Sequence, residues 1–336
     1  MTTSTPPSPP AALPRRHFLQ SAVAAGGLVV MAEAGGHASR LAPELSGRPA
    51  DNRRRVLRVA HLTDTHLDAS RRKSDEGLIA CLRHVGEHFR PDLILAGGDN
   101  IREAFNVPED VAAAQFEQWR RLIRAHSPAP VVHCIGNHDV WGWDKANSQT
   151  TGNEPRFGKA WAVEAFELPN RYYAFDRAGW HFVVLDSTFP HDEGYKGRLD
   201  DEQFEWLERD LAATPPTTPV LVLSHIPIVS AAALFDGENE KTGDWVVPGA
   251  WVHIDARRIK DLFYRHRNFK LALSGHLHLV ERVEYLGVHY ICDGAVSGGW
   301  WKGPYHEFDT GYGVIDLYDD GSFDWAFVVY PWTPQP

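Results

Sequence analysis

Cysteine is scarce in this chain of 336 residues. The three cysteines, Cys81, Cys134 and Cys292, lie in apolar segments, and the chain has no C-x-x-C pair. Their odd number argues against a disulfide framework, and the lack of paired cysteines argues against a zinc-finger type of metal site. We expect three buried free thiols, so any metal site has to be built from nitrogen and oxygen ligands.

Positive charge is also in short supply. The net charge is −10, and after the first few dozen residues the basic residues form only short blocks, such as the RRR at 53–55 and the RRK at 71–73. Non-specific binding to nucleic acid depends on Lys and Arg that neutralise phosphates, so we expect no nucleic-acid polymer among the partners. An anionic substrate would need positive charge placed locally, and metal ions are one way to supply it.

The N-terminal segment is typical of a targeting sequence. Arg15 and Arg16, in PRRHFLQ, resemble the twin-arginine export motif, and the apolar run after them is too short to span a membrane. The AEA at 32–34 offers a cleavage site. We therefore predict a twin-arginine signal peptide at 1–34, with export by the twin-arginine translocon to the periplasm or the extracellular space. The alternative is an arginine pair that only happens to precede a short helix.

The pattern of apolar residues predicts a polar linker at 35–55 and a folded domain at 56–336. In its first part, short apolar runs alternate with helical periodicity, which is typical of a parallel sheet covered by helices. We expect strands at 56–62, 92–98 and 131–136, and helices at 74–89 and 109–126.

The second part of the domain is richer in strands. We expect a hairpin at 171–186, helices at 200–211 and 254–266, and strands at 219–225, 269–274, 280–292, 312–318 and 322–330. Two irregular stretches remain, at 187–200 and 229–253. Loops of this length are usually functional or disordered.

Polar side chains of the kinds that bind metals follow five of the predicted strands. In open α/β sheets, ligands bind beyond the carboxyl ends of the strands, where the loops converge. Each residue alone has a common structural role, as a helix cap, a turn residue or a core histidine. Their joint occurrence instead predicts a metal site formed by Asp64, His66, Asp99, Asn137, His225, His276 and His278.

The last of these motifs, SGHLH, places His276 and His278 one residue apart. In an extended segment, side chains alternate between the two faces, so both imidazoles are predicted to project to the same side.

The ordered set D-x-H, G-D, G-N-H-D, H and G-H-x-H resembles the calcineurin-like metallophosphoesterase superfamily, over residues 56 to about 280. The resemblance implies a four-layer α/β/β/α sandwich with two mixed β-sheets and a dinuclear metal site at the carboxyl ends of the strands. It also implies roles for single residues. Asp64, His66, Asp99 and His278 correspond to the ligands of the first metal, and Asp99, Asn137, His225 and His276 to those of the second. His138 matches a histidine that binds no metal and lies beside the phosphate.

This resemblance implies two divalent metal ions, Mn, Fe or Zn, because the ligands are oxygen and nitrogen without thiolate. Two such ions about 3.5–4 Å apart hold the attacking and leaving oxygens of a phosphoryl displacement, and a hydroxide bridging them is the nucleophile. We expect hydrolysis of a small phosphoester, foremost a phosphodiester. The alternatives are phosphomonoesterase activity at the same site, or a protein that binds metal or phosphate without catalytic activity.

Two motifs found in other branches of this superfamily are missing from the sequence, which limits the branches that the chain resembles. The D-R-G element of the Ser/Thr protein phosphatases is missing from GGDNIREAF, and no DNA-binding cap is visible. The chain therefore resembles the bacterial phosphodiesterase-like branch, whose substrates include cyclic nucleotides, glycerophosphodiesters and nucleotide-lipids.

The substrate cleft is expected to include the segment GAVSGGWWKGPYHEF at 294–308. Its glycines allow close approach of the backbone, and Trp300, Trp301 and Tyr305 offer large amphipathic surfaces. Packing of the tryptophans into the core is the alternative. His138 is expected to protonate the leaving oxygen, with Asp139 as one possible carboxylate partner.

Overall fold

The computed structural model describes residues 52–332 of the chain. The predicted signal peptide at 1–34 and nearly all of the predicted linker at 35–55 lie outside the described residues. The first strand, β1 (Arg55–Leu62), begins at the end of that linker. None of the helices in 52–332 is both long enough and apolar enough to cross a membrane.

The first sheet is mixed and has the strand order β13-β12-β1-β2-β3. Three neighbouring strands are parallel: β1, β2 (Leu93–Ala96) and β3 (Val131–His133), with β3 at one edge. Strand β12 (Gly311–Tyr318) pairs with β1 in the antiparallel sense. The last strand of the chain, β13 (Phe323–Val329), forms the edge. Because β1, β2 and β3 run in one direction, the residues that follow them lie at one edge of the sheet.

The second sheet is also mixed and has the order β10-β11-β9-β8-β5-β4. Four strands run parallel: β5 (Trp180–Leu185), β8 (Val220–Ser224), β9 (Phe269–Ser274) and β11 (Val288–Asp293). The edge strands β4 (Tyr173–Arg177) and β10 (Val280–Tyr285) are antiparallel to their neighbours. The residues after β8 and β9 therefore share one edge of this sheet.

Helices cover the outer face of each sheet, and three apolar cores separate the layers. Residues of α1 (Arg72–His88) and α2 (Glu109–His126) pack with the outward side chains of the first sheet, such as Leu62 and Ile94. Residues of α5 (Asp201–Ala213) and α6 (Ala256–Arg265) pack in the same way on the second sheet. Between the sheets lies a third core, to which Val59 and Leu223 belong.

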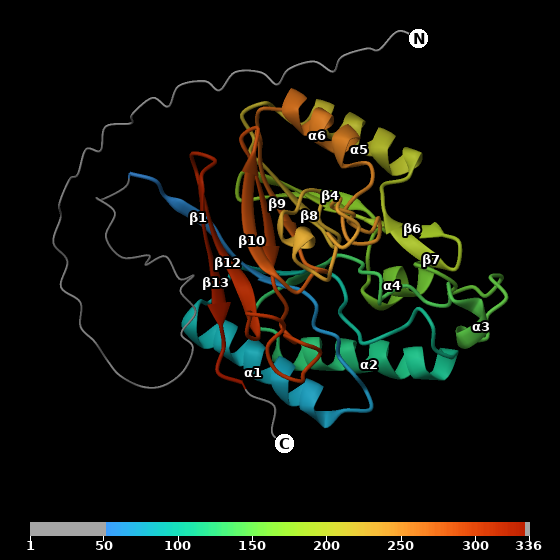
Figure 1. Cartoon of the computed structure of the whole chain (residues 1–336). Helices are drawn as coiled ribbons and strands as arrows, with labels where there is room; N and C mark the ends of the chain where they lie inside the picture. Colours follow the sequence, from blue (N-terminus) through green and yellow to red (C-terminus); the bar gives the residue numbers. More distant parts are fainter. Residues whose placement is uncertain (1–51, 333–336) are drawn as a thin grey trace, which may run out of the picture. The chain divides into compact units, whose positions relative to one another are not determined.

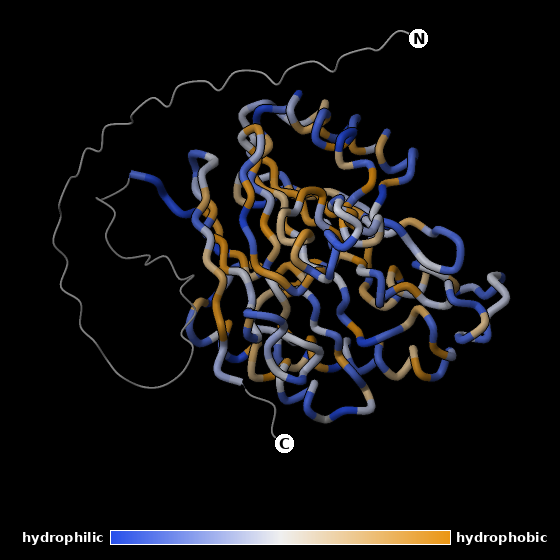
Figure 2. The backbone as a smooth tube through the Cα atoms, in the orientation of Figure 1, coloured by the Kyte–Doolittle hydropathy of each residue, from blue (hydrophilic) through white to orange (hydrophobic). Residues whose placement is uncertain are grey.

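These layers confirm the predicted four-layer α/β/β/α sandwich with two mixed sheets (Figure 1). Apolar segments are concentrated in the strands, whereas much of the helix surface and many of the loops are polar (Figure 2). Cys81, Cys134 and Cys292 are buried free thiols, as expected.

The structure corrects the prediction for one of the two irregular stretches. Residues 187–200 contain an antiparallel hairpin of β6 (Thr188–His191) and β7 (Gly194–Gly197). Residues 229–253 contain only a short 3-10 helix, η1 (Ala232–Leu234). Two short helices, α3 (Lys145–Ser148) and α4 (Ala160–Ala165), were not predicted.

Candidate metal centre

Five strand ends bring the predicted ligands together. Asp64, Asp99 and Asn137 follow β1, β2 and β3 of the first sheet, while His225 follows β8 and His276 follows β9 of the second. His66 and His278 lie two residues beyond Asp64 and His276. All seven lie in two adjoining groups of ligand atoms between the two sheet edges.

The first group consists of Asp64, His66 and His278, all buried. The Nε2 atoms of His66 and His278 face each other at 3.0 Å. Asp64 Oδ1 lies 3.4 Å from His278 Nε2 and 3.9 Å from His66 Nε2. Three donor atoms thus converge on one point.

The second group consists of Asp99, His225 and His276, with Asn137 beside it. His225 Nε2 lies 3.2 Å from Asp99 Oδ2 and 3.1 Å from Asn137 Oδ1. The two histidines of SGHLH therefore belong to different groups, as the resemblance implies.

Asp99 lies between the two groups and uses one oxygen toward both. Its Oδ2 is 3.2 Å from His225 Nε2 and 3.7 Å from His66 Nε2. Its Oδ1 accepts a hydrogen bond of 2.8 Å from the backbone N–H of His138. The backbone bond fixes the carboxylate, so Oδ2 is the atom directed toward both ligand groups.

Backbone carbonyls fix the orientation of three imidazoles. Nδ1 of His225 lies 2.9 Å from Gly97 O, and Nδ1 of His278 lies 2.7 Å from Gly298 O. In His276 the roles are reversed, because Nε2 contacts Ala250 O at 2.9 Å. A carbonyl on one ring nitrogen selects the tautomer whose other nitrogen is free to bind a metal. His276 thus offers Nδ1, whereas His225 and His278 offer Nε2.

Five of the seven predicted ligands have a left-handed backbone. The φ angles lie between 45° and 71° at Asp64, His66, Asp99, His276 and His278. Non-glycine residues rarely adopt this conformation, and clusters of such residues mark functional sites where the fold enforces the strain. The same observation corrects the prediction for SGHLH, since β9 ends at Ser274 and the histidines follow in a tight bend rather than an extended strand.

The donor set fits divalent cations. Asp64 Oδ1 is buried and has no hydrogen-bond partner, which is costly for a carboxylate unless a cation compensates it. Burial alone would raise the pKa of Asp64, but the imidazoles of His278 and His225 hold it below its ordinary value. The pKa of Asp99 is likewise held low, against the effect of burial, by His225 and His138. Both carboxylates are thus anionic ligands at neutral pH.

His138 lies at the edge of this cluster, and its carboxylate partner is Glu103. His138 Nδ1 is 3.1 Å from Glu103 Oε2, and Nε2 is 3.9 Å from Asp99 Oδ2. Burial lowers the pKa of the imidazole, but Asp99 and Glu103 outweigh this effect and raise the pKa to about 10. The expected partner, Asp139, instead accepts hydrogen bonds from the backbone N–H groups of Gly136, Asn100 and Ile101.

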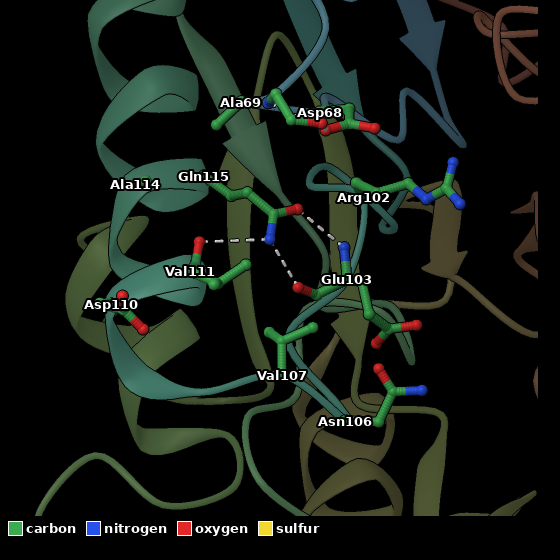
Figure 3. A pocket seen from close by; sticks show the side chains of 11 residues that line it. Asp68, Ala69, Arg102, Glu103, Asn106, Val107, Asp110, Val111, Ala114 and Gln115 are labelled. Carbon is green, nitrogen blue, oxygen red and sulfur yellow. Dashed lines mark hydrogen bonds between the residues drawn. The ribbon is translucent and has the colours of Figure 1, made fainter. Parts of the chain in front are cut away.

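Glu103 is itself held in place. Its Oε1 accepts from Phe105 N at 2.8 Å, and the side chain of Gln115 bonds both its N–H and its carbonyl oxygen, at 2.9 and 2.7 Å. Figure 3 shows Gln115 reaching from α2 to this backbone, beside a surface pocket of about 640 Å³. No motif in the sequence pointed to Glu103, because its role depends on the turn that follows Asp99.

A second pocket, of about 270 Å³, opens over the metal ligands. It is lined by His138, Trp300 and Tyr305, and also by Tyr195, Asp236 and Trp251, none of which was predicted. The Trp300 ring lies 4.5 Å from that of His278 and 5.4 Å from that of Tyr305. Two of the three residues expected in the cleft wall thus line this pocket.

Trp301 does not line this pocket, so the prediction that it forms part of the cleft wall is wrong. Its side chain is only 4% exposed and belongs to the core under α1, where its ring lies 5.0 Å from that of Trp332. Its Nε1 donates to His66 O at 3.1 Å, and any side chain at Gly77 would overlap its ring. Adjacent residues at a bend point in different directions, so Trp300 faces the site and Trp301 the core.

Replacing Trp301 with alanine is therefore expected to destabilise the protein by about 3–5 kcal/mol, because it empties a core site and removes the bond to His66. The Tm should fall by roughly 10 °C in a calorimetric scan. Trp300→Ala is the matched control and should change the Tm much less, since that ring borders the open pocket. Equal shifts in the two variants would contradict this assignment.

An α/β/β/α sandwich that carries two groups of Asp, Asn and His ligands around a shared carboxylate defines a dinuclear metal hydrolase. The family model described as calcineurin-like phosphoesterase matches residues 57–280, so the chain belongs to this family. The protein is accordingly a metal-dependent phosphoester hydrolase whose ligands suit two divalent ions.

Curated relatives include phosphodiesterases and phosphatases. The chain is 26% identical over 232 residues to the 3',5'-cyclic adenosine monophosphate phosphodiesterase CpdA of Escherichia coli K12, covering 66% of this chain and 70% of that protein. It is 28% identical over 191 residues to purple acid phosphatase 22 of Arabidopsis thaliana, covering 54% and 39% of the two chains. A dimetal phosphatase from Danio rerio shares the fold, with a TM-score of 0.56, 15% identity, and coverage of 79% of this chain and 94% of that one.

Proposed function

We propose that the protein hydrolyses small phosphodiesters in preference to phosphomonoesters. One observation carries this proposal: among residues 52–332, none of those that line the pocket over the metal ligands is a lysine or an arginine. A monoester carries up to two negative charges at neutral pH, whereas a diester carries one. A pocket without cationic side chains therefore suits the diester better.

The aromatic residues of the pocket support the same substrate class. Tyr195, Trp251, Trp300 and Tyr305 surround the metal ligands and offer apolar surfaces to organic groups. A diester has such a group on each side of phosphorus. The cyclic nucleotide phosphodiesterases among the relatives, which align over most of their length, agree with a diester substrate.

The ligand groups, Asp99 and His138 have separate roles in the proposed hydrolysis. When bound, the two cations neutralise the phosphoryl oxygens and activate a water molecule. Asp99, fixed by the N–H of His138, keeps the two ligand groups in register. His138, held by Glu103, is placed to give a proton to the leaving oxygen, which then departs as an alcohol.

The test compares bis(4-nitrophenyl) phosphate with 4-nitrophenyl phosphate, because both release the same leaving group. Protein loaded separately with Mn, Fe or Zn should hydrolyse the diester with a kcat/KM at least about tenfold higher, equivalent to about 1.4 kcal/mol. A higher kcat/KM for the monoester with every metal would make the protein a phosphomonoesterase.

We also propose that the protein is exported through the twin-arginine route, which carries folded proteins. Support comes from PRRHFLQ and the short apolar run that follows it. The combined Arg15→Lys, Arg16→Lys variant should accumulate in the cytoplasm, as measured by fractionation and immunoblotting, because the translocon tolerates lysine poorly at this pair. Export of this variant at the wild-type level would contradict the proposal.

A further inference from the structure

The β6–β7 hairpin brings a tyrosine to the metal centre. Tyr195, on β7, lines the pocket together with Asp99, Asn137 and His138. Its ring lies 6.2 Å from that of the ligand His276 and 6.1 Å from that of Phe105. The hairpin lies in a stretch whose sequence showed no regular structure, and the reaction described so far makes no use of it.

The base of this hairpin is anchored on both strands. On β6, the buried Asp186 accepts from Thr188 Oγ1 at 3.2 Å, and the ammonium group of Lys159 contacts both Asp186 and Thr188 O. On β7, Gly197 donates to Gly249 O at 2.8 Å and accepts from Ile254 N at 2.8 Å. Because Tyr195 is two residues from Gly197, its position is set by the fold before any substrate arrives.

The hydroxyl of Tyr195 is free within the described part of the chain. No residue of 52–332 forms a hydrogen bond with it, it is not among the enclosed polar atoms, and its side chain lines the pocket. The other tyrosine of this pocket differs, since Tyr305 donates its hydroxyl to Asp236 Oδ1 at 2.9 Å. Of these two hydroxyls, only that of Tyr195 is available to a ligand.

A phosphoester bound at the cations needs donors for its non-bridging oxygens, where negative charge resides. Hydrogen-bond donors already in position stabilise such charge best, because they need no reorganisation during the reaction. The pocket lining has no lysine or arginine to fill this role. A neutral phenol is a suitable donor beside cations, because it adds no charge to the site.

We propose that Tyr195 donates a hydrogen bond to a non-bridging oxygen of the bound phosphoester and is a catalytic residue of this site. This inference rests on phosphoester hydrolysis at the metal centre but not on the preference for diesters. It is therefore tested with whichever nitrophenyl ester the wild-type protein hydrolyses faster.

The test replaces Tyr195 with phenylalanine, which keeps the ring and removes only the hydroxyl. A lost hydrogen bond to a charged group should lower kcat/KM about 10- to 100-fold. Inhibition by inorganic phosphate, measured in the same protein, should also weaken. Metal content and Tm should match the wild type. Tyr172→Phe is the matched control and should stay within about twofold in kcat/KM, because Tyr172 does not line the pocket and its hydroxyl donates to Glu202 Oε1 at 3.3 Å.

Three results would overturn the proposal. One is an unchanged kcat/KM in Tyr195→Phe, and another is a loss that parallels a fall in bound metal or in Tm. The third is an equal loss in Tyr172→Phe, which would show a general effect of removing a tyrosine hydroxyl rather than a contact with the substrate. A reversed preference for the monoester would refute the proposed substrate class while leaving the role of Tyr195 measurable on that substrate.

Discussion

Replacing Asp99 with asparagine is expected to remove both metals from most of the protein and to lower kcat by about 10⁴-fold, since cations at such a site contribute several kcal/mol. The reason is the position of Oδ2, which lies within 3.7 Å of nitrogen ligands from both groups. Asparagine keeps the size of the side chain but loses the negative charge. Metal analysis and steady-state kinetics on the same sample give the two quantities.

His66→Ala and His278→Ala are the matched comparisons, because these residues belong to the first group and not to the group of His225 and His276. Protein reconstituted with excess metal should hold close to two ions per chain in the wild type. It should hold about one in either histidine variant and fewer in Asp99→Asn. Two retained ions in Asp99→Asn would show that Asp99 does not bridge, and one ion or none in the wild type would contradict a dinuclear site.

The resemblance to the family implied the four layers, and the order of strands and polar residues in the sequence predicted that the candidate metal ligands lie together. Strands such as β2 and β8 are short, mainly apolar runs buried on both faces, and Asp99 and His225 follow within three residues of their ends. Parallel strands then bring those ends to one edge whatever the details of the loops. The prediction that the ligands meet therefore depends on local sequence together with one rule of topology, whereas the four layers were implied by the resemblance to the family.

The residues around the ligands could not be predicted in this way, because their roles depend on backbone turns. Glu103 reaches His138 only because Asp99 has a left-handed backbone and the chain turns sharply after it. Trp300 and Trp301 are adjacent and chemically identical, yet they point to the pocket and to the core. No periodicity in the sequence separates such pairs.

The β6–β7 hairpin that carries Tyr195 could not be predicted from the sequence either. The stretch 187–200 contains Pro190, two glycines and several charged residues, so its composition indicates a loop. The hairpin forms because contacts from distant segments hold it, including Lys159 at β6 and Ile254 at β7. Tertiary contacts of this kind override local propensity and leave no signal in the segment itself.

Replacing His138 with alanine is expected to lower kcat far more for an alkyl phosphodiester than for a nitrophenyl one. General acid catalysis contributes about 10²–10⁴-fold, and the need for it grows with the basicity of the leaving group. Nitrophenolate leaves readily without a proton, whereas a ribose or glycerol alkoxide does not. We therefore expect a loss within that range on the alkyl ester and a much smaller one on the nitrophenyl ester, measured with both metals bound.

The Glu103→Gln variant distinguishes an effect on the protonation of His138 from an effect on the position of its imidazole ring. Cations held by the ligand groups would compensate the charge of Asp99. Glu103, whose Oε2 lies 3.1 Å from His138 Nδ1, would then be the carboxylate that favours a protonated His138. Glutamine preserves the backbone bonds to Gln115 but removes that charge, so this variant should show the same dependence on leaving group as His138→Ala, with a smaller loss. Its metal content should be unchanged, because Glu103 belongs to neither ligand group.

The outcome also decides between two roles that the geometry allows for His138. Its Nε2 lies 3.9 Å from Asp99 Oδ2, close enough for His66, Asp99 and His138 to form a ligand group of their own. If His138 is a metal ligand, the His138→Ala variant should contain less metal, and kcat should fall equally for both substrates. If His138 is a general acid, the variant should retain both metals, and the loss in kcat should grow with the basicity of the leaving group. Equal losses with both metals retained would leave it as an electrostatic group that orients the phosphate.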